Sequence, residues 1–179
     1  MNAPSADLAA ALPEAAREIE DFVSTGGWDQ PPQLFALVPT AELIAAEPAL
    51  AGQVDPLSPL TPVAQEPLRG ALDDALAGIA WPRGVAGCAV VQEIAVLPPD
   101  AEAAIEIDGV SEADMVRAAA AHPRRREARL VAAVLRDGVG ACVLRLRAAD
   151  ESEDAVEELV ERPDLAPNLL AALHDTFRA

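Results

Sequence analysis

The chain has 179 residues, of which 51% are hydrophobic and 3% aromatic, and its 30 acidic residues against 13 basic ones give a formal net charge of −17. This length fits one domain whose core needs no disulfide or metal to hold it. The acidic balance argues against binding to nucleic acid or to an anionic membrane, and every base is an arginine because the chain contains no lysine.

The first element is predicted to be an amphipathic helix that runs continuously from about residue 12 to residue 24. Apolar residues recur at helical spacing, with Phe22 among them, while Glu20 is expected on the opposite, charged face. Pro13 would break a helix interior, so we expect it in the first turn, after a separate short turn.

A strand, a helix and a long connection follow. The apolar run at 33–38 predicts a strand that is covered on both faces. A helix is expected from 41 to 47, with Thr40 as its N-cap. Prolines recur between 52 and 67, so we interpret residues 52–67 as a surface connection with little secondary structure.

The middle of the chain predicts two helices and two strands. A helix is expected from about 67 to 79, and a run rich in valine and isoleucine predicts a strand at 85–97. Alternation at 103–107 suggests a short edge strand. A capping box at Ser111 then begins a helix that stops at His122-Pro123.

Two apolar runs within 127–147 meet at Asp137-Gly138 and predict a β-hairpin with a two-residue type I′ turn. In this register Arg136 lies opposite Val139. The face expected to meet the core contains Arg129, Val131, Ala133, Leu135, Gly140, Cys142, Leu144 and Leu146. The other face is apolar in its middle and carries Arg136, Arg145 and Arg147 toward its ends.

The last elements are predicted to be an acidic helix at 150–161 and a helix from Pro167 to about Phe177. Together the elements indicate one α+β domain over residues 1–179. Its antiparallel or mixed sheet contains the hairpin, at about 128–147, and is covered by amphipathic helices. A doubly wound parallel sheet is disfavoured because it requires crossovers and a glycine-rich turn.

Cysteine and histidine are the residues that we considered for metal or nucleophilic chemistry. Cys88 and Cys142 fall within predicted strands, which indicates buried thiols in a reducing compartment; whether they are neighbours stays open. No two of Cys88, Cys142, His122 and His174 have metal-site spacing, so we expect no metal and no cofactor. Without a signal peptide or membrane span, a cytoplasmic location is expected.

Arginine is concentrated in one region, because eight of the 13 arginines fall between Arg117 and Arg147. Arg124, Arg125, Arg126 and Arg129 are the candidate binding residues. One interpretation is that they neutralise neighbouring acidic stretches. The other is a site for an anionic ligand or an acidic partner segment.

Two segments, 27–43 with its Trp-Asp-Gln-Pro-Pro sequence and 164–169, resemble a small uncharacterised family of acidic actinobacterial proteins. The resemblance spans the chain but implies no activity, substrate, cofactor or catalytic residue.

The sequence therefore favours a non-enzymatic cytosolic protein-binding or adaptor module, which binds another protein or itself as a homodimer. The alternative is a small-molecule (anion) binding regulator or enzyme that uses Arg124, Arg125, Arg126 and Arg129. An exposed apolar surface or a two-fold interface would favour the first, and a pocket of convergent arginines the second.

Overall fold

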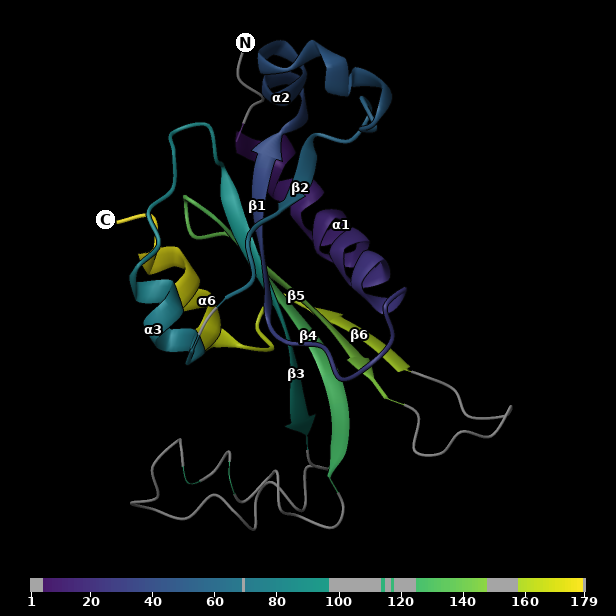
Figure 1. The fold of residues 1–179 in the computed structure, drawn as a ribbon, viewed down its shortest axis with the longest axis vertical. Helices are drawn as coiled ribbons and strands as arrows, with labels where there is room; N and C mark the ends of the chain where they lie inside the picture. The colour runs from purple at the N-terminus through teal and green to yellow at the C-terminus, as the bar shows by residue number, and fades with distance from the viewer. Residues whose placement is uncertain are drawn as a thin grey trace.

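The computed structural model describes residues 5–68, 70–96, 114, 117, 125–147 and 158–178. Its centre is a six-stranded sheet in the order β2-β1-β3-β4-β5-β6, in which every neighbouring pair is antiparallel (Figure 1). The strands are β1 (Gln33–Pro39), β2 (Leu60–Ala64), β3 (Gly87–Val96), β4 (Arg126–Leu135), β5 (Gly140–Leu146) and β6 (Glu158–Arg162). The predicted α+β class is confirmed.

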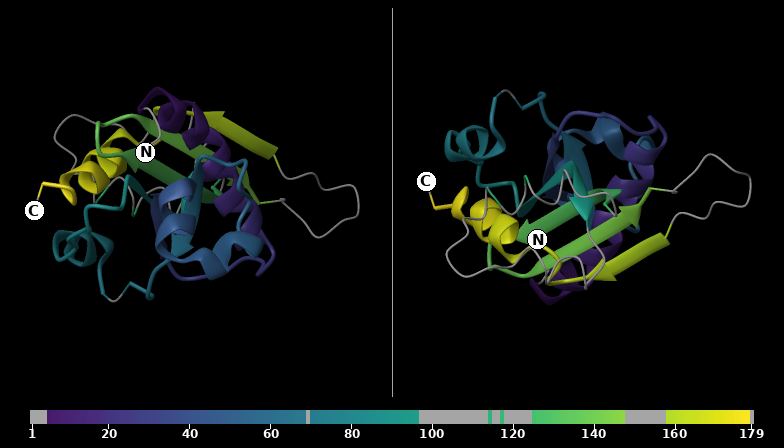
Figure 2. Two further views of the ribbon diagram at one scale, coloured as in Figure 1. Left: turned by 90° about the horizontal axis from the view of Figure 1, so that it is seen from above. Right: turned by 90° about the horizontal axis from the view of Figure 1, so that it is seen from below.

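Helices cover both faces of this sheet. The helices whose bounds lie in the described ranges are α1 (Ser5–Ser24), α2 (Thr40–Ala46), α3 (Leu72–Ala77) and α6 (Pro167–Asp175), with a 3-10 turn η1 (Pro48–Gly52) after α2. Figures 1 and 2 show α1 on one side of the sheet and α3 with α6 on the other. We call these sides the α1 face and the α6 face.

Each face has its own aliphatic core. On the α1 face, Leu12 and Ile19 of α1 pack with Val131 and Val143. On the α6 face, Leu173 packs in a cluster with Val90 and Val134. β4 is buried on both sides from Ala128 to Leu135. The predicted strands at 33–38 and 85–97 and the last helix are confirmed.

The first helix differs from its prediction in two ways. It continues through Pro13 as one 20-residue helix, because packing of its apolar residues before and after Pro13 stabilises it. The orientation of two side chains is also the reverse of that predicted. Glu20 is 0% exposed and Phe22 is 61% exposed, because Glu20 continues the buried i, i+4 row of Leu12 and Ala16.

The connection after β1 contains more regular structure than predicted. Thr40 is the first residue of α2 rather than its cap, and its hydroxyl lies 2.7 Å from that of Thr61. The segment 52–67 contains β2, which a proline-rich sequence can form because β2 is an edge strand.

One further helix boundary was predicted wrongly, and the described end of another predicted helix is a strand. α3 begins at Leu72 rather than near 67, after Gly70 with a positive φ of 76°. The end of the predicted acidic helix is strand β6, because the spacing of Leu159 and Val160 fits either structure over so few residues. The strand predicted at 103–107 lies outside the described residues. Of the helix predicted after Ser111, only Asp114 and Arg117 are described, both helical.

The central hairpin is confirmed, but its turn is not type I′. Leu135 N donates to Val139 O and Gly138 N donates to Leu135 O, both at 2.9 Å, so the loop has three residues. Gly138 has a φ of 95°, whereas Asp137 has no positive φ. The Asp137 carboxylate accepts a bond from Val139 N at 3.1 Å. This pattern fits a type I turn followed by a glycine bulge.

The different turn shifts the register by one residue and therefore exchanges the faces of β5 relative to β4. Arg129 lies opposite Arg145, and Val131 lies opposite Val143, all on the α1 face. Cys142, predicted to share the face of Arg129, belongs to the α6 face.

Candidate functional site

The corrected register brings two arginines of the sheet to one glutamate of α1. The Glu20 carboxylate accepts bonds from Arg129 Nη1 at 3.3 Å and from Arg145 Nε and Nη2 at 2.5 and 2.7 Å. The side chains of Glu20, Arg129 and Arg145 are 0%, 1% and 20% exposed. Charges this deeply buried are stable only when paired, so this network cross-links α1 to β4 and β5.

The segment after α1 closes over the network. Gly27, with a φ of 79°, presents its carbonyl oxygen to Arg129 Nη2 and to Gln30 Nε2. The Trp28 ring lies over two guanidinium groups, 4.5 Å from Arg129 and 5.4 Å from Arg147. Such cation–π contacts are strongest where water is excluded.

The next two residues fix this segment to the sheet. Asp29, which has a positive φ of 66°, and Gln30 donate their backbone N–H groups to the Glu93 carboxylate at 2.9 and 2.7 Å. Arg147 binds the carboxylates of Asp29 at 3.3 Å and Glu127 at 2.5 Å. Hydrogen bonding to Glu127 raises the pKa of Arg147 above its usual range. The Trp-Asp-Gln-Pro-Pro sequence thus has a structural role as the cover of a buried ion network.

The network itself offers no room to a ligand. The described side chains around Gln30, Glu93 and Arg129 leave no cavity large enough for a water molecule. Arg129 Nε is buried without a hydrogen-bond partner among the described residues, which raises the cost of burying this guanidinium.

The four candidate arginines do not converge on one site in the described part of the chain. Arg124 lies outside the described residues, and Arg125 is exposed just before β4. Arg126 donates Nη2 to Arg147 O at 3.0 Å, and Arg129 is held by Glu20. Sequence reasoning missed Glu20 as the shared partner of Arg129 and Arg145. The signal that Glu20 is buried was its spacing of four residues from Ala16, which itself follows Leu12 by four.

The two thiols are buried, free and on strands that β4 separates. Burial raises the pKa of Cys88 to about 12, although a hydrogen bond from Thr176 opposes this shift, and burial also raises the pKa of Cys142. His174 Nε2 lies 2.8 Å from Arg136 O. Within the described ranges, no three His, Cys, Asp or Glu side chains are grouped to hold a metal. His122 lies outside these ranges.

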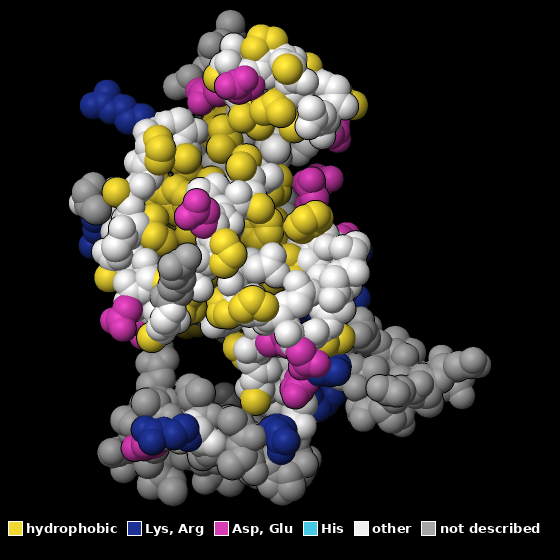
Figure 3. All heavy atoms as spheres, in the orientation of Figure 1, with side chains coloured by type: hydrophobic (Ala, Val, Ile, Leu, Met, Phe, Trp, Pro, Cys, Tyr) yellow, Lys and Arg dark blue, Asp and Glu magenta, His cyan; other side chains and the backbone are white. Residues whose placement is uncertain are grey.

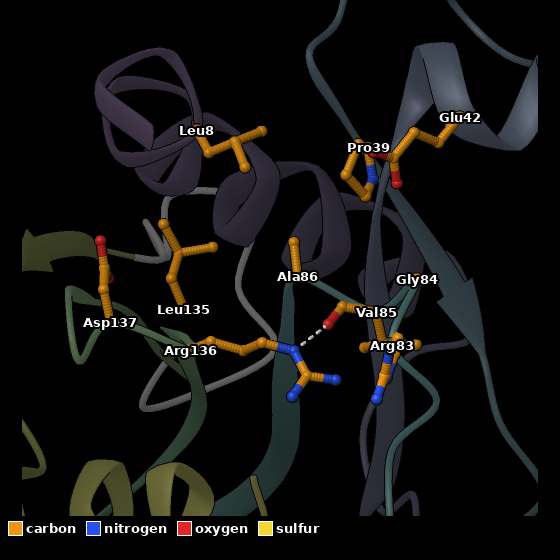
Figure 4. Close-up of a pocket in the computed structure, with 10 residues that line it drawn as sticks. All are labelled: Leu8, Pro39, Glu42, Arg83, Gly84, Val85, Ala86, Leu135, Arg136 and Asp137. Atoms are coloured by element: carbon orange, nitrogen blue, oxygen red, sulfur yellow. Dashed lines mark hydrogen bonds between the residues drawn. The ribbon is translucent and has the colours of Figure 1, made fainter. Parts of the chain in front are cut away.

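An open cleft of about 310 Å³ lies at the end of the sheet near the hairpin turn. Leu8, Ala86 and Leu135 line it, whereas Arg136 extends along one side and donates Nε to Val85 O at 2.6 Å (Figure 4). Arg136 also donates to Pro82 O at 2.7 Å, and its guanidinium lies 4.7 Å from the Phe177 ring centre. The Arg136 guanidinium therefore binds carbonyl oxygens of the protein's own backbone.

A different surface combines exposed apolar groups with acids. Phe22 of α1 is 61% exposed, and Leu57, in the turn before β2, is 89% exposed. Partial burial raises the pKa of Glu18, and the carboxylates of Glu14 and Asp55 raise it further, so this turn lies near α1. We call these five residues the α1–β2 surface. In Figure 3, hydrophobic side chains gather over β1 and β2, and the arginines lie mainly toward the margins.

A family model described as PPA1309-like protein matches residues 12–178, as the resemblance to a small uncharacterised family implied. No curated protein and no solved structure matches the chain. None of the helices in the described ranges is both long and apolar enough to cross a membrane. With nearly the whole chain matched, the protein belongs to the PPA1309-like protein family.

Proposed function

We propose that this member of the PPA1309-like protein family is a non-enzymatic protein-binding module of the cytoplasm, whose α1–β2 surface binds a basic segment of another protein. The observation that carries the proposal is the exposure of Phe22 and Leu57, at 61% and 89%, beside three carboxylates. When a partner covers large apolar side chains, the free energy falls by about 25 cal/mol for each Å² of apolar surface that is removed from water.

Electrostatics favour a basic partner over a second copy of the same surface. Partial burial raises the pKa of Glu18 most, and repulsion of its ionised form by Glu14 and Asp55 raises it further. A lysine or arginine of a partner would relieve this repulsion. Two identical acidic surfaces would repel each other, and the net charge of −17 extends the preference for cationic partners over the whole chain.

A cytoplasmic location is supported by the two buried free thiols, which suit a reducing compartment. The lysine-free, arginine-rich composition supports an actinobacterial source. The runner-up function, an anion-binding regulator or enzyme, is supported by the concentration of arginine between Arg117 and Arg147. Glu20 already neutralises Arg129, so the first function is preferred.

The proposal can be tested by affinity capture from the source cells with matched baits. The baits are the wild-type chain, a Phe22→Ser/Leu57→Ser variant and a Val139→Ser control, since Val139 is also apolar and 39% exposed. We expect wild type and Val139→Ser to capture the same basic proteins, and the double variant to capture about tenfold less of each, or lower still. Equal retention by all three baits, or none above background, would contradict the proposal.

A further inference from the structure

We propose that β6 is a self-association edge, at which two copies of the chain pair antiparallel about a two-fold axis through Val160. The two six-stranded sheets would then continue as one. This interface is separate from the α1–β2 surface, so either proposal can fail while the other holds.

The two edges of the sheet differ in their capacity to accept another strand. β2 carries Pro62 at its centre, opposite Leu37, and proline has no N–H to donate. Gln65 N donates to Leu34 O, so the odd-numbered residues of this strand face β1 and Pro62 faces outward. β6 contains no proline from Glu158 to Arg162. Within the described sheet, strand addition is therefore blocked at β2 and open at β6.

The ladder fixes which backbone groups of β6 face outward. Leu135 N donates to Val139 O and Arg147 N donates to Glu127 O, so odd-numbered residues on the β5 side of the hairpin bond to β4. The even-numbered residues of β5 therefore face β6, where they pair with Glu158, Val160 and Arg162. This arrangement leaves the N–H and C=O groups of Leu159 and Glu161 on the outer edge.

The sequence of β6 is complementary to itself in antiparallel pairing. With Val160 opposite its own copy, Leu159 of one chain pairs with Glu161 of the other, and their outward groups form the hydrogen bonds. Glu158 then lies opposite Arg162 of the second copy, and the same pair recurs on the other side of the axis. Opposite charges at directly opposed positions stabilise a sheet. Neither Glu158 nor Arg162 has an ion-pair partner among the described residues, and both are exposed.

A neighbouring register is less favourable. A two-fold axis through Glu161 would place this carboxylate opposite itself, and like charges at directly opposed positions destabilise a sheet. It would also place Leu159 opposite Pro163, which has no N–H to donate. The pairing through Val160 avoids both conflicts.

The interface involves five residues on each side, so we expect a weak dimer that forms as the protein is concentrated. Sedimentation velocity of the full chain, from about 1 µM to 1 mM, should show the mass rise from 18.6 kDa toward twice that value. Glu158→Arg and Arg162→Glu should each place like charges opposite each other and weaken the dimer by about tenfold or more. The double swap should restore the opposite-charge pairs and the dimer.

Two controls separate this interface from general charge effects. Asp73→Arg, at an exposed residue of α3, changes the net charge as Glu158→Arg does and should dimerise like wild type. On concentration, the amides of Leu159 and Glu161 should become protected from hydrogen exchange, while those of Val160 and Arg162 stay protected at every concentration. A monomer up to about 1 mM, or a dimer unaffected by both single charge reversals, would overturn the proposal.

Discussion

The two faces of the sheet are both buried beneath helices, but different interactions hold them. On the α1 face, Glu20 joins Arg129 and Arg145 in an ionic network at 0%, 1% and 20% exposure. On the α6 face, Trp81 Nε1 donates to Thr176 Oγ1 at 2.8 Å beside the Cys88 thiol, so these inner polar contacts are neutral, and the charged Arg136 over Phe177 is exposed. Both faces bury an aliphatic core, so the charges of the α1 face are not needed to supply apolar burial and have another role.

The difference suggests that the ion network specifies the register of the hairpin. Arg129 and Arg145 reach Glu20 because they lie opposite each other on the same face. A slip of one residue would carry one of them to the α6 face and leave a buried charge without its partner. An apolar face tolerates such a slip better, because valine, alanine and leucine occupy both faces of β4.

The largest effect is expected from breaking the α1 face. Glu20→Gln would leave two arginines without their buried carboxylate and should lower the free energy of unfolding by about 3 to 5 kcal/mol. Chemical denaturation measures this loss. The control is Glu14→Gln on the exposed side of the same helix, which should change stability by no more than about 0.5 kcal/mol. Equal losses of unfolding free energy in the two variants would show that the ionic network does not stabilise the α1 face.

A substitution in the core of the α6 face should lower the free energy of unfolding by a somewhat smaller amount, and this loss should not depend on salt concentration. Leu173 is 0% exposed, and Leu173→Ala removes apolar contacts and leaves a cavity, at a cost of about 2 to 4 kcal/mol. Thermal or urea melts at low and high salt should give the same loss. A loss that changed strongly with salt would show that charges also stabilise this face.

A smaller effect is expected at the hairpin turn. Gly138 has a φ of 95°, which a residue with a Cβ adopts at a cost of about 1 to 2 kcal/mol, so Gly138→Ala should lower the melting temperature. Gly52 has no positive φ, and a Cβ at this position would meet no atom within 4 Å, so Gly52→Ala is the matched control. A Gly138→Ala protein as stable as the control would argue against the glycine bulge.

The smallest effect concerns two arginines at the start of β4: Arg125, which is exposed just before the strand, and Arg126, which is its first residue and half-buried. If Arg125 and Arg126 only balance neighbouring acids, phosphate or a dicarboxylate should shift the melting temperature no more than chloride of equal ionic strength. The Arg125→Gln/Arg126→Gln variant should then respond to salts as wild type does. A saturable shift with the polyvalent anion, lost in the variant, would instead support the anion-binding function.

β1, β3, the two strands of the hairpin and the last helix were predictable because their apolar residues form strong patterns, whereas the short edge strands β2 and β6 and the hairpin register were not. β4 is buried on both faces, so its apolar residues do not alternate and cannot define the register. Only the Asp137-Gly138 turn remained as a guide, and this pair also suits a type I turn with a bulge. The error of one residue separated Arg129 from Arg145 and concealed the network with Glu20.

Other parts of the candidate site depend on tertiary contacts that no local pattern contains. Glu20 has the charge of a surface residue, yet its position four residues after Ala16 places it under the sheet. The Trp28 ring and the Asp29 backbone become interpretable only once Arg129, Arg147 and Glu93 are known to lie beneath them.

The most direct test of the central claim is a double-mutant cycle between Glu20 and Arg129. Unfolding free energies would be measured for wild type, Glu20→Gln, Arg129→Gln and the double variant. If the pair acts as one buried unit, the double variant should lose at least about 1 kcal/mol less than the sum of the two single losses. Losses that add to within about 0.5 kcal/mol would contradict the ionic link between α1 and the sheet.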